Sequence, residues 1–237
     1  MIYFASDIHL GSGDIARQRA TEQRFVKWLE SIEPTAEVLF LLGDIFDFWF
    51  EYKRVVPKGF VRTLGQLAKI AERGTRIVML TGNHDMWVGK YLTEECGIEL
   101  YTTPQTFDIK GLKLYLSHGD NTNIKGQPML RLMNRFFRSK SLRVLASWLI
   151  HPDLFLRFGQ WWSGSSRKAH TEQTDLKYLD PLIEFAKGYD EQPIDHFVFG
   201  HIHIPHQRDN ITFLGEWSKA ASWAELDDNG IITLKTK

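Results

Sequence analysis

The hydrophobic and polar positions of the chain alternate between short apolar runs and longer segments with helical periodicity. Four runs have the length of β-strands, and they cover residues 38–42, 77–80, 112–117 and 196–199. The runs 38–42 and 77–80 are apolar throughout, which is typical of a strand buried on both faces of its sheet. Three further short segments near the C-terminus predict antiparallel strands at residues 211–214, 219–224 and 231–235.

Two segments between these strands predict helices. Residues 16–32 carry apolar side chains at helical spacing and end before Pro34, and residues 57–73 begin at a proline and end before Gly74. Strands that alternate with helices and then give way to a strand-rich end predict a layered α/β sandwich. A chain of 237 residues fits one domain, residues 1–237, that carries an insertion.

Residues 125–168 break this alternation and predict a helical insertion that caps the core. They contain nine Lys or Arg residues, seven Phe or Trp residues and one acidic residue, Asp153, for a net charge of +8. Pro128, Pro152 and the Ser/Gly segment 163–166 would divide the insertion into three short helices. Such a face suits an anionic membrane or a phosphate-bearing ligand, and it equally suits a cap whose aromatic residues pack on the core while its cations face water.

Composition limits the class of protein and its compartment. The 29 basic residues balance the 29 acidic residues, which argues against a surface that binds nucleic acid throughout. The single cysteine, Cys96, has no partner for an internal disulfide, as is typical of a reducing compartment. A strand that begins at Ile2 leaves no room for a signal peptide, and no apolar stretch approaches about 18 residues. We therefore expect a cytoplasmic protein whose cap can contact a membrane surface.

Residues that can bind metal ions follow most of the predicted strands. They occur in the motifs Asp7-Ile8-His9, Gly43-Asp44, Gly82-Asn83-His84-Asp85, His118 and Gly200-His201-Ile202-His203. Each motif alone has a plainer explanation, such as a surface turn, a helix N-cap or an incidental pair of histidines. Five such coincidences at successive strand ends are far less plausible than one shared site, because the carboxyl ends of strands are where open α/β sheets hold their sites.

The types of donor indicate which metals and which chemistry. Oxygen and imidazole donors without thiolates suit Mn, Fe, Zn or Mg. Seven donors are too many for one ion, and the carboxylate of Asp44, in the middle of the series, can bridge two. Two divalent ions roughly 3.5–4 Å apart neutralise phosphoryl oxygens and activate water. The sequence therefore predicts a binuclear metal hydrolase.

These motifs, in this order, resemble the calcineurin-like metallophosphoesterase superfamily over nearly the whole chain. The resemblance implies a layered αββα sandwich with a helical cap. It implies one metal ion held by Asp7, His9, Asp44 and His203, and a second held by Asp44, Asn83, His118 and His201. It also implies that His84 stabilises charge on the phosphoryl group or protonates the leaving oxygen, with Asp85 as the partner of its ring.

Within the superfamily, the chain is most similar to the UDP-2,3-diacylglucosamine pyrophosphohydrolases of lipid A biosynthesis. The segments that carry this similarity are 43–49, 117–120 and 214–217, together with the basic, aromatic insertion. The resemblance implies Mn²⁺-dependent hydrolysis to UMP and 2,3-diacylglucosamine 1-phosphate by a peripheral protein on the cytoplasmic face of the inner membrane. The best-studied branch has arginine in place of His84.

Substrate contacts and other activities follow from the same residues. We expect Asn83, His84 and His201 to contact the substrate, and Arg167 and Lys168 of the cap to contact its diphosphate. A different phosphoesterase activity, on a small phosphodiester or on nucleic acid, is the alternative, and nuclease activity would then depend steeply on salt. A non-enzymatic scaffold on the same fold is disfavoured because none of the expected ligands is missing.

Overall fold

The computed structural model describes residues 1–122, 132, 139–171 and 175–237, without the side chains of residues 140, 143, 160 and 165–171. Two β-sheets form its centre. The first has the strand order β11-β10-β1-β2-β3-β4. Its strands are β1 (Ile2–Ala5), β2 (Val38–Leu42), β3 (Arg76–Leu80), β4 (Ile98–Tyr101), β10 (Ser222–Leu226) and β11 (Ile232–Thr236). Strands β1 to β4 are parallel, whereas β10 and β11 are antiparallel additions.

The second sheet has the order β5-β6-β7-β9-β8. Its strands are β5 (Gln105–Ile109), β6 (Leu112–Ser117), β7 (His196–Phe199), β8 (His206–Arg208) and β9 (Ile211–Phe213). The central strands β6, β7 and β9 are parallel, and β5 and β8 pair antiparallel at the two edges. Both sheets therefore contain parallel strands that end on the same side of the molecule.

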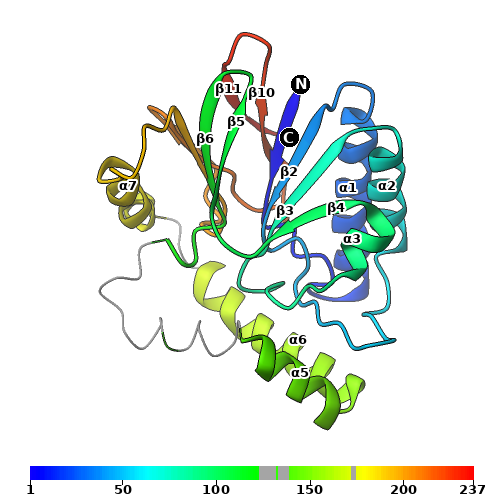
Figure 1. Cartoon of the computed structure of the whole chain (residues 1–237). Coiled ribbons are helices and arrows are strands. Elements are labelled where there is room, and N and C mark those ends of the chain that lie inside the picture. The colour runs from blue at the N-terminus through cyan, green and yellow to red at the C-terminus, as the bar shows by residue number, and fades with distance from the viewer. Residues whose placement is uncertain (123–131, 133–138, 172–174) are drawn as a thin grey trace.

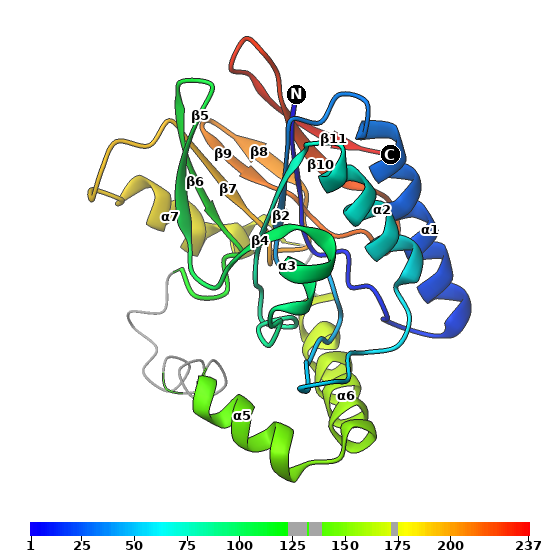
Figure 2. The same ribbon diagram turned by 45° about the vertical axis from the view of Figure 1, so that its right-hand side comes forward.

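Helices cover the outer faces of both sheets, so the molecule has four layers (Figures 1 and 2). Helices α1 (Ile15–Ile32), α2 (Val61–Glu72) and α3 (Tyr91–Cys96) lie on the first sheet. The 3₁₀ helix η1 (Leu176–Leu179) and helix α7 (Asp180–Lys187) lie on the second. Helices α5 (Lys140–Leu149) and α6 (Pro152–Thr171) lie apart from these layers, at the end of the molecule where β1 finishes. The predicted α/β sandwich is thus confirmed.

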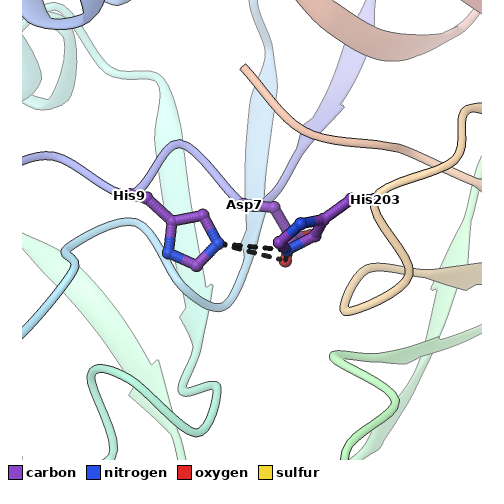
Figure 3. A group of neighbouring side chains, drawn as sticks. All are labelled: Asp7, His9 and His203. Atoms are coloured by element: carbon purple, nitrogen blue, oxygen red, sulfur yellow. Dashed lines mark hydrogen bonds and ion pairs between the residues drawn. The ribbon is translucent and has the colours of Figure 1, made fainter. Parts of the chain in front are cut away.

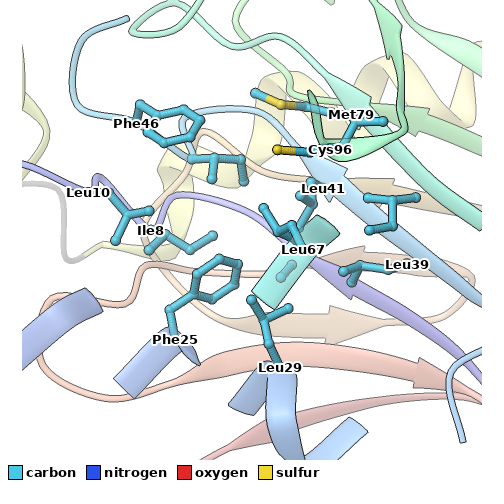
Figure 4. Packing of buried hydrophobic residues seen from close by; sticks show 14 of the residues in the cluster. Ile8, Leu10, Phe25, Leu29, Leu39, Leu41, Phe46, Leu67, Met79 and Cys96 are labelled. Atoms are coloured by element: carbon cyan, nitrogen blue, oxygen red, sulfur yellow. The ribbon is translucent and has the colours of Figure 1, made fainter. Parts of the chain in front are cut away.

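Alternation along the strands explains the layers. In β1, Ile2 and Phe4 face the second sheet, whereas Tyr3 and Ala5 face the helices. Phe25 of α1 is fully buried in the helix-side layer (Figure 4). Complete burial of a large apolar side chain contributes about 1.5–3 kcal/mol, so both faces of this sheet hold the strand ends in place.

The boundaries of several predicted elements need correction. Helix α2 begins at Val61 rather than near Pro57, because Phe60 adopts a left-handed conformation with a φ of 60°. The Ser/Gly segment 163–166 does not break the cap, since α6 continues from Pro152 to Thr171. The buried position of Ser163 on the core explains why its poor helix propensity is overridden. The earlier part of the expected insertion, residues 125–138, falls outside the described residues except for Leu132. Across the parts of the chain that the structure describes, every helix is too short or too polar to cross a membrane.

Candidate metal centre

The predicted metal-binding motifs meet where the strands of both sheets end. Asp7 and Asp44 follow β1 and β2 of the first sheet, and His118 and His201 follow β6 and β7 of the second. The centre therefore lies across the ends of the two sheets, below α6 of the cap. All four residues lie one or two positions beyond the end of a strand, so the sheets fix where their loops begin.

The backbone bends sharply at several of the candidate metal-binding positions. Asp7, His9, Asp44 and His201 all have positive φ angles, of 54°, 50°, 53° and 65°. Residues other than glycine rarely adopt this left-handed conformation, and such strain is concentrated at functional sites. The bend at Asp7 and His9 allows side chains two positions apart to face one point.

Glycines allow the loops to approach the carboxylates closely. A Cβ atom on Gly82 would lie 2.1 Å from Oδ1 of Asp44, and a Cβ atom on Gly200 would lie 2.8 Å from Oδ2 of Asp7. Any larger residue at either position would displace a carboxylate. The two glycines therefore belong to the construction of the centre, although they offer no donor to it.

Each central carboxylate uses one oxygen as an anchor and directs the other into the centre. Oδ2 of Asp7 accepts a hydrogen bond of 3.0 Å from the backbone N–H of His201. Oδ1 of Asp44 accepts one of 2.9 Å from the backbone N–H of His84. The second oxygens, Asp7 Oδ1 and Asp44 Oδ2, are thereby held among imidazole nitrogens.

Asp7, His9 and His203 form the first group of donors (Figure 3). Nε2 of His9 lies 3.2 Å from Nε2 of His203, and Oδ1 of Asp7 lies 3.5 Å from the latter and 3.9 Å from the former. Oδ1 of Asp7 is buried and has no hydrogen-bond partner within the described part of the chain. The two ring nitrogens lie within hydrogen-bond distance of each other, but the carboxylate oxygen has no hydrogen-bond partner among them. Three atoms that each offer a lone pair and converge on one point are better satisfied by a cation than by one another.

Asp44, Asn83 and His118 form the second group. Nδ1 of His118 lies 2.8 Å from the carbonyl oxygen of Leu42, so it must carry the proton and donate. Nε2 of His118 then presents its lone pair to Oδ1 of Asn83 at 3.2 Å and to Oδ2 of Asp44 at 3.4 Å. Three acceptors again meet at one point, which fits a second cation. His201 lies beside them, with its ring edge-on to that of His118 at 5.1 Å between centroids.

Electrostatics favours a positive charge here. Burial lowers the pKa of His9 to about 3, which leaves its ring neutral and able to bind metal. Burial, the largest single effect, would lower the pKa of His118 too, but attraction to and hydrogen bonding with Asp44, together with the charges of Asp7 and Asp120, outweigh burial and raise that pKa well above its usual value. The carboxylates thus stabilise a cation at this point, a place that divalent metal ions would fill.

Carboxylates also lie behind the first group of histidines. Oδ1 of Asp47 lies 3.7 Å from Nδ1 of His9, and Oε2 of Glu216 lies 3.6 Å from Nδ1 of His203. Carboxylates behind metal-binding histidines orient the rings and raise their basicity. The sequence reasoning missed Asp47, whose only signal was its place in the run Gly43-Asp44-Ile45-Phe46-Asp47.

The surroundings of His84 differ from the expected pairing with Asp85. Nδ1 of His84 lies 3.0 Å from the carbonyl oxygen of Asp47, and it also contacts the hydroxyl of Ser163 on α6. Nε2 faces the centre, 3.9 Å from Oδ2 of Asp44. The carboxylate of Asp85 points away from this ring and towards the backbone N–H groups of Gly82 and Ile45, although the two residues are neighbours in sequence.

Asp85 instead holds two loops together. Its Oδ1 accepts a hydrogen bond of 2.8 Å from the backbone N–H of Gly82, and its Oδ2 accepts one of 2.8 Å from Ile45 and one of 3.4 Å from Phe46. Burial and repulsion from Asp44 raise the pKa of Asp85 to about 6 in spite of these bonds. Asp85 is therefore a structural residue beneath the centre.

Arg167 and Lys168 are the cap residues that the sequence assigns to the diphosphate. Helix α6 runs through Arg167 and Lys168, but the side chains of both lie outside those that the structure describes. Their expected contact with a diphosphate stays a prediction.

Comparison with known proteins decides the family. The model of the calcineurin-like phosphoesterase family matches residues 1–205. The chain belongs to this family. A phosphoesterase of this family with these converging donors is a metal-dependent hydrolase of phosphoesters or diphosphates. A solved structure of zinc-bound Vps29 from Entamoeba histolytica aligns with 100% of this chain and 97% of the Vps29 chain at 11% sequence identity. Its TM-score of 0.41 is too low to carry an inference.

Curated relatives of this phosphoesterase share one name. A UDP-2,3-diacylglucosamine hydrolase from Porphyromonas gingivalis is 33% identical, and the alignment covers 98% of this chain and 95% of the relative. Proteins of the same name from Histophilus somni and Pseudomonas aeruginosa are 27% and 28% identical, with coverage of 96% and 97% of this chain and of 97% and 96% of the relatives.

Proposed function

We propose that this phosphoesterase hydrolyses the diphosphate of UDP-2,3-diacylglucosamine to UMP and 2,3-diacylglucosamine 1-phosphate, a step of lipid A biosynthesis. Full-length similarity to relatives of that name carries the proposal. The position of the centre beneath an apolar cap supports it. Water adds to one phosphorus atom, the bridging P–O bond breaks, and the two phosphates separate.

Two divalent ions, for which we propose Mn²⁺, fit the two groups of donors. Asp7, His9 and His203 would hold the first ion and Asn83, His118 and His201 the second, with Asp44 between them. When bound, the ions neutralise the phosphoryl oxygens and lower the pKa of water. Fe, Zn and Mg suit the same oxygen and imidazole donors.

His84 and Asn83 would contact the diphosphate from the core. Nε2 of His84 faces the centre, where it would stabilise charge on the phosphoryl group or protonate the leaving oxygen. The amide of Asn83 is only partly buried, and it would reach both the second ion and the substrate. From the cap, Arg167 and Lys168 would add positive charge beside the diphosphate.

The acyl chains of the substrate need apolar surface near this centre. A cavity of about 220 Å³ opens beside Asp47 and Phe48. Apolar residues dominate its lining, namely Leu10, Phe48, Val55, Val56, Pro57, Phe60, Pro152 and Leu156. We place an acyl chain here, because transfer of each methylene group from water contributes about 0.8 kcal/mol.

Exposed apolar residues of the cap support a membrane contact. Trp148 and Leu149 at the end of α5 are 84% and 74% exposed, and Trp161 of α6 is 66% exposed. Such residues, next to a cationic segment, are typical of proteins that lie on an anionic bilayer. We therefore propose a cytoplasmic protein that binds peripherally to the inner membrane.

The activity is tested by incubating the Mn²⁺-loaded protein with UDP-2,3-diacylglucosamine and measuring UMP by mass spectrometry. Release of UMP, absent after treatment with EDTA and in the Asp44→Ala variant, is the expected result. Turnover of bis(p-nitrophenyl) phosphate without turnover of the lipid would reject the substrate but not the metal centre. Salt-sensitive cleavage of RNA or DNA instead would favour the nuclease alternative.

A further inference from the structure

One face of helix α6 packs against the loop that contains Asp47. Its residues Phe155, Gly159 and Ser163 recur every fourth position and so lie on the same side of the helix. All three are buried, and Phe155 and Ser163 are only 7% and 1% exposed. Trp161, off this face, is 66% exposed. The face made by Phe155, Gly159 and Ser163, here called the docking face, therefore joins this part of the cap to the core.

The docking face leaves little freedom in the position of α6. The ring of Phe155 lies 4.4 Å from that of Phe50 and 5.4 Å from that of Trp87, measured between centroids. One turn further along, Gly159 meets the ring of Phe48 so closely that a Cβ atom would lie 2.4 Å from it. Because interiors are close-packed, this contact sets the height of the helix above the loop.

Ser163 lies one turn beyond Gly159 and reaches the metal centre through His84. Its hydroxyl donates a hydrogen bond of 2.5 Å to the carbonyl oxygen of Asp47. That bond uses its only proton, so towards Nδ1 of His84 the same oxygen can only accept. The carbonyl of Asp47, 3.0 Å from Nδ1, can also only accept. Two acceptors at Nδ1 assign the proton of the ring to that nitrogen.

We propose that Ser163 is a positioning residue, which accepts the Nδ1–H of His84 and so fixes the direction in which Nε2 faces the metal centre. With Nδ1 held, the ring cannot flip without breaking hydrogen bonds to both Ser163 and Asp47. Nε2 remains 3.9 Å from Oδ2 of Asp44, where a phosphoryl oxygen would meet it. A cap helix thereby helps to orient a core residue, and an α6 displaced from the core would leave His84 without its hydrogen bond to Ser163.

The inference rests on the phosphoesterase activity of the proposed function but not on its lipid substrate. It is therefore tested both with UDP-2,3-diacylglucosamine and with bis(p-nitrophenyl) phosphate. If only the aryl ester is turned over, the proposed substrate fails while the role of Ser163 is still measured.

The decisive experiment is a double-mutant cycle between Ser163→Ala and His84→Ala in the Mn²⁺-loaded protein. Loss of one of the hydrogen bonds that hold the ring should lower kcat roughly ten-fold in Ser163→Ala, with KM and metal content unchanged. In the His84→Ala background the same substitution should change kcat less than about two-fold, because residues that act as a unit are not additive. Equal effects in both backgrounds, an unchanged kcat, or a raised KM alone would each overturn the proposal.

Two further variants separate positioning from general damage to the cap. Ser147→Ala in α5 is the matched control and should keep full kcat, since within the described part of the chain that hydroxyl bonds back to the carbonyl of Val144 in its own helix. Gly159→Ala should lower kcat in the wild-type background, since the added methyl group pushes α6 away from Phe48, and it should do little when His84 is absent. A Gly159→Ala variant with full kcat would show that the position of α6 does not govern His84.

Discussion

The substitution Asp85→Ala distinguishes a structural carboxylate from a catalytic one. In the structure this side chain bonds to three backbone N–H groups of two loops and not to the ring of His84. Removal of the carboxylate leaves two buried N–H groups that formerly had partners at 2.8 Å, and a third that had a partner at 3.4 Å. Each orphaned buried donor costs about 1–3 kcal/mol, so the two short bonds alone predict a loss of about 4 kcal/mol in the free energy of unfolding.

Such a loss is large for a protein of this size. In domains of about 150–250 residues, 1 kcal/mol changes the unfolding temperature by roughly 2–4 °C, so Asp85→Ala should lower it by about 8–16 °C. The measurement is thermal unfolding of the metal-free protein, followed by circular dichroism in EDTA. Metal-free protein is used so that weaker metal binding does not add to the result. Asp190→Ala, at an exposed loop position, is the control and should unfold like the wild type.

The opposite outcome would refute this reasoning. If Asp85 oriented the ring of His84, its removal would lower kcat while the unfolding temperature changed by less than about 2 °C. A stable Asp85→Ala variant with normal metal content and a collapsed kcat would therefore return Asp85 to the role that the sequence suggested.

Three further predictions concern charge, space and pH. Asp44→Asn should lower the bound Mn²⁺, measured by elemental analysis, from two ions per chain to at most one. The lost unit charge, about 4 Å from an ion, contributes about 4 kcal/mol at an effective dielectric constant of 20, which is roughly 10³-fold in affinity. Two ions retained would contradict a bridging carboxylate. Gly82→Ala should abolish turnover in the aryl-ester assay, since its Cβ atom would lie 2.1 Å from Asp44, whereas Gly65→Ala in α2 has open space and should keep both fold and turnover. Burial lowers the pKa of His196 to about 4, so the unfolded chain takes up a proton near pH 6.5 before the folded chain does, and metal-free stability should fall by about 3 kcal/mol as the pH falls from 6.5 to 4. Buried His9, with its pKa of about 3, adds a loss of the same sign in the wild type and in the variant. Denaturant titrations at both pH values should therefore show a loss smaller by about 3 kcal/mol in His196→Gln, which can keep a bond to Thr212, than in the wild type; an equal loss in both would place the acid sensitivity elsewhere.

The sequence predicted the strands and the donors for one physical reason. A strand buried on both faces must be apolar, so a carboxylate or imidazole directly after it stands out. Val38–Leu42 followed by Asp44 is such a case, and so is His196–Phe199 followed by His201. Because the parallel strands of both sheets end on one side, donors found separately along the chain could be assigned to one centre before any coordinates were known.

The same reasoning failed where spatial neighbours replace sequence neighbours. His84 and Asp85 are adjacent in sequence, and pairing them was the simplest interpretation. The structure instead brings Asp47 from the loop after β2 and Ser163 from the cap to the ring of His84. A hydrophobic pattern reports which face of an element is buried, but it carries no information about which distant loop will cross that face.

Segment 163–166 shows why the cap was harder to interpret than the core. Serine and glycine are poor helix formers, and as a local signal they predict a break. In the folded chain, however, the missing side chain of Gly159 and the small side chain of Ser163 are what allow α6 to approach Phe48 and Asp47. A small residue in this helix therefore marks a close contact between helix and loop and not a hinge, and a sequence can distinguish the two only when the partner loop is known. Ser163, the first residue of a segment that resembled a linker, thus contacts His84 beside the candidate metal centre.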